Sequence, residues 1–79
     1  MTNHQKYLNA FTSTLLVEES VLTDLKYQDL PAWDSVGHMA LMAALEEAFE
    51  IEMDIDDIIE FSSFEYGRSI LAKYGINLE

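Results

Sequence analysis

Apolar residues recur at helical spacing near the start of the chain, over roughly residues 2–18. They lie three or four positions apart, which is the spacing that places side chains on one face of a helix. The residues of this stripe are Tyr7, Leu8, Phe11, Leu15 and Leu16. The intervening Thr-Ser-Thr sequence has low helix propensity, so packing rather than local preference must stabilise this segment. The pattern predicts an amphipathic first helix.

The most apolar segment, residues 36–49, predicts a second helix. It consists mostly of strong helix formers and has no β-branched residue after Val36, so we expect a buried helix. Asp34 and Ser35 stand at its start, where a side-chain oxygen can accept a hydrogen bond from the unpaired N–H groups of the first turn. We therefore expect Ser35 at the beginning of this helix, with its hydroxyl group exposed.

Residues 19–33, between these two helices, show no regular pattern and predict a long connection with apolar anchors. The anchors are Val21, Leu22, Leu25 and Leu30. Pro31 favours an extended conformation at the preceding residue and keeps the second helix from starting earlier. Loops of this length inside compact domains are usually functional or held by their own side chains. We expect Trp33 to pack against the start of the second helix.

The last third of the chain predicts two further helices. Asp54 and Asp57 have the spacing of caps for a short helix over residues 55–60, with Ile58 and Phe61 facing inward. A final helix then extends to about Tyr74. It follows serine and glutamate residues at the spacing of a capping box, Ser62 and Glu65, and precedes a terminating glycine, Gly75. Its predicted buried face comprises Phe64, Ile70, Leu71 and Tyr74.

No alternating strand pattern and no internal repeat accompanies these helices. The predicted fold class is therefore all-α. We expect a small four-helix bundle, with three main helices and one short helix, in a single domain over residues 1–79. The methionine and phenylalanine residues of the later helices are expected in its core. They are Met39, Met42, Phe49, Met53, Phe61 and Phe64.

Composition narrows the possible functions of this domain. The chain of 79 residues has four Lys plus Arg against fifteen Asp plus Glu residues, which gives a formal net charge of −11. This charge repels nucleic acid and anionic membranes and favours partners with basic surfaces. The chain contains no cysteine, so it has neither a disulfide nor a thiolate nucleophile of its own. With no targeting or membrane-spanning pattern, we expect a cytoplasmic monomer.

Acidic residues are concentrated between positions 46 and 60, where no basic residue interrupts them. They are Glu46, Glu47, Glu50, Glu52, Asp54, Asp56, Asp57 and Glu60. Such a run is either a solvated face or a docking surface for basic partners. The spacing lacks the central glycine and terminal glutamate of a calcium-binding EF-hand loop, so we expect only weak divalent binding and predict no metal site.

Several motifs together resemble the acyl carrier protein family. Asp34-Ser35-Val36 matches the Asp-Ser-Leu that opens the second helix in that family. The sequence Ala-Leu-Glu-Glu-Ala-Phe at 44–49, an acidic link and paired serines before the last helix follow in the same register. The resemblance implies that Ser35 carries 4′-phosphopantetheine, attached by a phosphopantetheinyl transferase, and that the chain is a carrier rather than an enzyme. It also implies that Asp34, besides capping the helix, assists docking of the transferase.

The resemblance further implies partners and a docking surface. Carriers of this family present the later part of helix two and helix three to basic grooves of loading ligases and downstream synthases. The corresponding residues are Val36, Met39, Glu46, Glu47, Glu50, Asp54, Asp56, Asp57 and Glu60. In the family, the space between these helices can also shelter the acyl chain.

Other residues depart from the fatty-acid carriers, and alternatives remain open. Trp33 precedes the motif, and Gly37 and Ala40 stand where fatty-acid carriers commonly have acidic residues, which favours a specialised carrier. An aminoacyl or peptidyl carrier fits the Trp-Asp-Ser motif equally well, and an unmodified acidic helical adaptor is a third hypothesis.

His38 lies one turn after Ser35, where an exposed imidazole could contact the phosphate. A serine–histidine hydrolase is disfavoured, because the chain lacks a Gly-x-Ser-x-Gly sequence.

Overall fold

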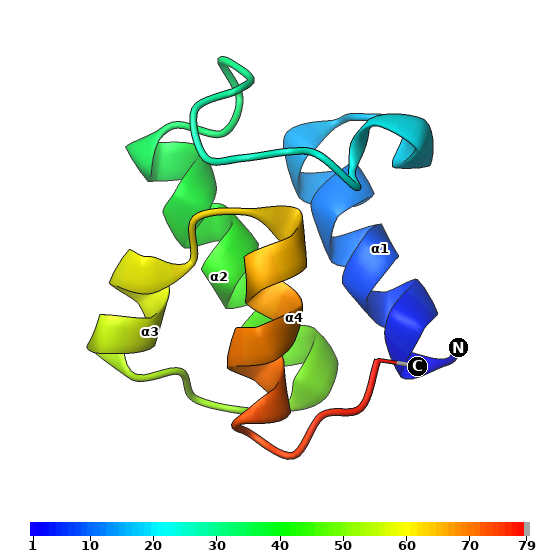
Figure 1. Cartoon of the computed structure of the whole chain (residues 1–79), viewed down its shortest axis with the longest axis vertical. Helices are drawn as coiled ribbons and strands as arrows, with labels where there is room; N and C mark the ends of the chain where they lie inside the picture. The colour runs from blue at the N-terminus through cyan, green and yellow to red at the C-terminus, as the bar shows by residue number, and fades with distance from the viewer. Residues whose placement is uncertain (79) are drawn as a thin grey trace.

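The computed structural model describes residues 1–78, and this part of the chain contains four α-helices. They are α1 (Asn3–Leu15), α2 (Ser35–Phe49), α3 (Ile55–Glu60) and α4 (Phe64–Ala72), with a short 3-10 helix, η1 (Glu19–Val21), after α1. No strand occurs in residues 1–78, where an isolated bridge joins Lys26 to Ser63. The helical fold and its four α-helices agree with the sequence prediction. In Figure 1, α1 and α3 lie on opposite sides of the view, with α2 and α4 between them.

α1 begins with a capping box that the apolar pattern did not indicate. The Thr2 hydroxyl accepts a hydrogen bond from the Gln5 N–H at 3.1 Å, and the Gln5 side chain accepts one from the Thr2 N–H at 3.0 Å. The helix ends at Leu15, earlier than the predicted position near Glu18, because Leu16 adopts a left-handed conformation with φ 56°. The expectation that Leu16 joins the buried stripe is wrong, since this side chain is 86% exposed.

The segment between α1 and α2 is attached to the rest of the protein by side chains and by its backbone. Leu22 and Leu25 are buried in the core. The Tyr27 N–H donates to the Ser62 carbonyl at 2.9 Å, and the Phe64 N–H donates to the Leu25 carbonyl at 3.0 Å. These bonds hold the segment against the start of α4.

Aromatic side chains fill the space between α1 and α4, which we call the α1–α4 interface. The rings of Tyr7 and Phe11 have centroids 4.8 and 5.0 Å from that of Phe64. The Tyr7 hydroxyl donates to the Phe64 carbonyl at 2.6 Å, and burial raises the pKa of this phenol, which keeps it protonated as a donor. Gly67 permits this packing, because a Cβ there would overlap the Phe61 ring and the Tyr7 hydroxyl.

The ends of α4 agree with the prediction except for the identity of the cap. Ser63 rather than Ser62 is the N-cap, and its side chain accepts a hydrogen bond from the Tyr66 N–H at 3.0 Å. The predicted Ser62–Glu65 capping box is therefore wrong by one position. Gly75 has φ 80° and ends the helical turn, as glycine after a helix commonly does.

Candidate functional site

Ser35 is the first residue of α2, and its side chain is exposed, as expected. Asp34 is the N-cap, and its Oδ1 accepts a hydrogen bond from the Gly37 N–H at 2.8 Å. The backbone N–H groups of Ser35 and Val36 belong to the same first turn, which carries the partial positive charge of a helix N-terminus. The Ser35 hydroxyl is thus presented to solvent beside groups that favour an attached anion.

Gly37 allows the preceding loop to lie against the first turn of α2. A Cβ at this position would overlap the backbone carbonyl oxygen of Ala32, which has no flexible side chain to move aside. The loop is also held by the Gln28 N–H, which donates to the Trp33 carbonyl at 3.0 Å. Close packing therefore explains the glycine two positions after Ser35, where the sequence departs from the fatty-acid carriers.

His38 lies one turn after Ser35, but its ring is engaged within the protein. Its Nδ1 accepts a hydrogen bond from the Trp33 Nε1–H at 3.0 Å, and its Nε2 lies 2.7 Å from the Ile58 carbonyl oxygen. Because an indole N–H can only donate, Nδ1 is the acceptor and Nε2 carries the proton. The expectation of an exposed His38 is wrong. Both ring nitrogens are used internally, which leaves neither free as a base for Ser35 nor as a donor to a phosphate.

Trp33 packs at the start of α2, as the sequence predicts, and is fully buried. Its ring lies nearly parallel to that of His38, at an interplanar angle of 15° and a centroid distance of 6.2 Å. The edge of Phe11 from α1 meets it from another side, with centroids 5.5 Å apart. Trp33 thus connects the first turn of α2 to the aromatic core.

An apolar hollow of about 370 Å³ opens between α2 and α3 directly beside Ser35. Ser35, His38 and Met39 of α2 form one wall and Ile58 and Ile59 of α3 form the other. Tyr27, Phe61 and Ser62 complete the lining. The inward position predicted for Ile58 and Phe61 is consistent with their packing on the core. Ile59 and Tyr27 were not predicted as site residues. The sequence carried no signal that singled out these two residues, because neighbouring helix positions can both be buried, as Leu41 and Met42 are in α2.

The face of α2 next to this hollow is exposed rather than buried. Val36 is 76% and Met39 is 56% exposed, whereas Leu41, Met42 and Leu45 form the buried face. The predictions of a wholly buried second helix and of a core position for Met39 are therefore wrong. Ile55 and Ile59 of α3 are exposed as well. Val36, Met39 and Ile59 thus place accessible apolar surface around Ser35.

The acidic residues of 46–60 fall into two groups. Most are exposed, in agreement with either a solvated face or a docking surface; they are Glu47, Glu50, Glu52, Asp54, Asp56 and Glu60. Glu46 is partly buried, and its Oε2 accepts a hydrogen bond from the Met53 N–H at 2.8 Å, which shapes the link between α2 and α3. The exposed group is the part of the run that a partner can reach.

Asp57 does not belong to that exposed surface, and its expected place in the docking set is wrong. It is only 6% exposed, and its carboxylate accepts hydrogen bonds from Lys73 Nζ and from the Tyr74 hydroxyl, the latter at 2.6 Å. These two hydrogen bonds hold the pKa of Asp57 below its usual range. The Asp54 N–H also donates to the Tyr74 hydroxyl at 2.8 Å, whereas the Asp54 side chain makes no capping bond. The start of α3 is therefore tied to the end of α4.

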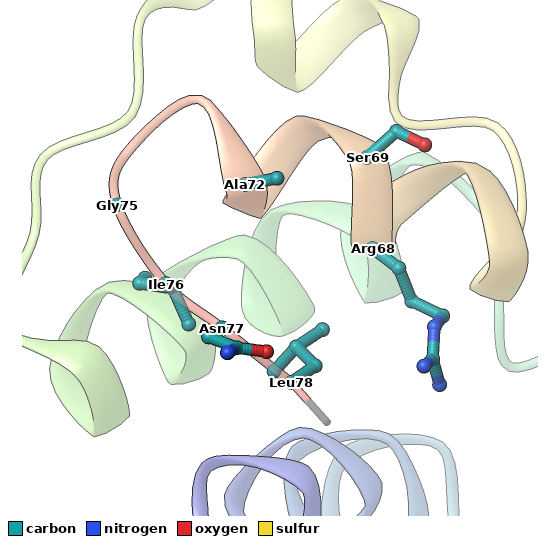
Figure 2. Close-up of a pocket in the computed structure, with 7 residues that line it drawn as sticks. All are labelled: Arg68, Ser69, Ala72, Gly75, Ile76, Asn77 and Leu78. Carbon is teal, nitrogen blue, oxygen red and sulfur yellow. The ribbon is translucent and has the colours of Figure 1, made fainter.

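A second hollow, of about 400 Å³, lies between α4 and the C-terminal segment. Figure 2 shows Arg68, Ser69 and Ala72 on α4, with the chain from Gly75 to Leu78 passing beside them. None of the residues around Ser35 lines this hollow. It is therefore separate from the site at the start of α2.

Two further features of the described residues concern metal ligands and membrane spans. No group of three or more histidine, aspartate or glutamate side chains in residues 1–78 is arranged to hold a metal ion. Within the same residues, no helix combines the length and apolar character needed to cross a membrane.

No family model matches the chain, and searches among curated proteins and solved structures found no significant match.

Proposed function

We propose that this chain is a carrier protein whose Ser35 hydroxyl receives 4′-phosphopantetheine and then carries an acyl group as a thioester. The main support is the exposed hydroxyl at the first residue of α2, beside an apolar hollow. A new phosphodiester at Ser35 would lie next to the N–H groups of a helix N-terminus, which stabilise negative charge. When bound, the group supplies the thiol that the chain itself lacks.

The attachment requires only an accessible hydroxyl from this chain. The Ser35 oxygen attacks the phosphorus of coenzyme A that bears the pantetheine, and the bond from that phosphorus to the bridging oxygen breaks. Adenosine bisphosphate leaves, and the serine proton passes to a base. Since both His38 nitrogens are already hydrogen-bonded, the base must come from the transferase. Asp34 then serves to hold the first turn and, in this proposal, to dock the transferase.

The docking surface for the transferase, the loading ligase and the downstream synthase combines apolar and acidic side chains. Val36 and Met39 supply exposed apolar contacts beside Ser35. The exposed acidic residues that follow supply charge for basic partner grooves, and they are Glu47, Glu50, Asp54, Asp56 and Glu60. Such an arrangement steers partners by charge and places their apolar contacts next to the attachment point.

The test is the mass of the intact protein after incubation with coenzyme A, magnesium and a broad-specificity phosphopantetheinyl transferase. We expect wild type to gain the mass of one phosphopantetheine and Ser35→Ala to gain none. Ser62→Ala is the matched control, because Ser62 is also exposed and borders the same hollow but does not begin a helix. Unmodified wild type, under conditions that convert a known carrier, would reject the proposal.

The two alternatives give different results in this experiment. An aminoacyl or peptidyl carrier also gains phosphopantetheine but is loaded by an amino-acid-adenylating ligase and not by an acyl ligase. An unmodified adaptor gains no mass, yet still binds a basic partner through its acidic and apolar surface. The exposed apolar residues around Ser35 are compatible with all three functions, so the mass measurement is decisive only for the modification itself.

A further inference from the structure

His38 lines the hollow beside Ser35 and bridges its two walls. The imidazole extends from α2 and its Nε2–H reaches the Ile58 carbonyl of α3 at 2.7 Å. The ring thus links the two helices that form the walls of the hollow. Behind it lies the fully buried Trp33, which donates to Nδ1. His38 therefore stands between the apolar hollow and Trp33, which does not line it.

The bond to Ile58 also matters for the position of α3. Ile58 lies in the last turn of this helix, where carbonyl groups lack regular helical partners. The other hydrogen bond that its carbonyl accepts, from the Phe61 N–H, is long at 3.4 Å. A helix of six residues is too short to be stable alone. The imidazole consequently supplies one of the few polar contacts that hold this end of α3 against α2.

The ring contacts around His38 leave little room for a chain to pass. Tyr27 meets the imidazole edge-on at a centroid distance of 5.2 Å, and Phe61 lies 6.2 Å away on another side. Both residues also line the hollow. An apolar group that enters from Ser35 therefore meets a wall of three rings before it can reach Trp33.

Resting on the proposed attachment at Ser35, we infer that His38 is a specificity-determining residue that limits how deeply the carried group enters between α2 and α3. The group lies in the hollow against Met39 and Ile59 and does not reach Trp33. A short acyl group fits within this space, whereas the end of a long chain remains at the surface. The preferred cargo is therefore short, or is one whose far end must stay accessible to an enzyme.

Trp33 provides a direct test because it is the only tryptophan and lies behind the imidazole. The chain has no cysteine, so Ser35→Cys introduces a single thiol. This variant is labelled with maleimides that carry alkyl chains of increasing length, each with a bromine at its far end. Bromine quenches indole fluorescence on contact. Chains without bromine and the same labels on Ser69→Cys, in the separate hollow beside α4, are the controls.

With His38 present, we expect no loss of Trp33 fluorescence at any chain length beyond that of the controls. Substitution of His38 by two amides then separates its hydrogen bonds. His38→Asn places an oxygen near Nδ1 but cannot reach Ile58, so the longer chains should enter and remove most of the fluorescence. His38→Gln places an N–H near Nε2, keeps the link to Ile58, and should restore exclusion.

Strong quenching by the long chain with His38 in place would overturn the inference, and this result needs no His38 variant to fold. Equal quenching in His38→Asn and His38→Gln, with both variants folded by circular dichroism, would also overturn it. The label is attached chemically, so the outcome does not depend on the transferase. Failure of Ser35 modification rejects the proposed function, whereas failure of exclusion rejects only the role of His38.

Discussion

The α1–α4 interface and the interface between α2 and α3 are held together by different interactions. The first is filled by buried aromatic rings, with Gly67 leaving the space they need. The second, which we call the α2–α3 interface, contains the apolar hollow beside Ser35 and is bridged by the His38–Ile58 hydrogen bond. On another side, α3 is attached to the end of α4 through Asp57, whose carboxylate accepts a hydrogen bond from the Tyr74 hydroxyl.

This difference separates a rigid part of the molecule from an adaptable one. Displacing a side chain in this close-packed aromatic core forces the neighbouring rings to shift. Displacing α3 requires the loss of a few hydrogen bonds and of the Ile58 contacts with the core, whereas its outward residues Ile55 and Ile59 are already exposed. The candidate attachment site at Ser35 lies at the adaptable interface, while the rigid one fixes the position of the first turn of α2 through Phe11 and Trp33.

The largest expected effect is at Gly67 in the α1–α4 interface. Gly67→Ala adds a methyl group where Phe61 and Tyr7 already lie, so we expect a loss of about 1–3 kcal/mol in the free energy of unfolding despite the better helix propensity of alanine. Urea denaturation measures it. Ser69→Ala, at an exposed position of the same helix, should change stability little. Equal stability of the two variants would show that the aromatic interface is not rigid.

A smaller effect is expected for the Tyr7 hydroxyl, which is the polar link of the same interface. Tyr7→Phe keeps the ring but removes the donor to the Phe64 carbonyl, which should cost about 1 kcal/mol of unfolding free energy. Tyr66→Phe is the control, because Tyr66 is exposed and should tolerate the change. A neutral result for Tyr7→Phe would mean that ring packing alone holds α1 to α4.

The features that the sequence predicted correctly depend on neighbouring residues. The start of α2 at Ser35 follows from Asp34, whose side chain caps the first turn at a separation of three residues. The end of the helical segment that contains α4 follows from Gly75, because glycine adopts a positive φ without steric cost. Such local signals are readable because both the residue and its partner lie within one turn.

The features that the sequence did not predict depend on partners distant in the sequence, or on which face of a helix is buried. The orientation of His38 depends on Ile58, and the burial of Asp57 depends on Tyr74, each on a different element of the fold. The sequence predicts a core position for Met39 because methionine is usually a core residue. α2 has apolar residues on several faces, so its periodicity does not indicate that Met39 lies on the exposed one. These positions were decided by tertiary contacts alone.

The smallest global effect is expected at Asp57, where α3 meets α4. Lys73 and Tyr74 lower the pKa of this carboxyl group, so its contribution to stability is present above the pKa of an unfolded aspartate and is lost as the pH falls through the lower folded value. Asp57→Asn should therefore melt slightly below wild type near neutral pH, and the difference should disappear well below pH ~4. Since Lys73 is open to solvent, high salt should reduce the difference.

The local effect of Asp57→Asn distinguishes the two interfaces. Amide hydrogen exchange near neutral pH should accelerate in α3, which loses one of its attachments, and remain unchanged in α1, whose contacts do not involve Asp57. Exposed Asp56→Asn on the same helix is the matched control, since it removes equal charge without a hydrogen bond in the structure. Exchange that accelerates equally in α1 and α3 would mean that both interfaces open together, and the distinction between a rigid and an adaptable part would then fail.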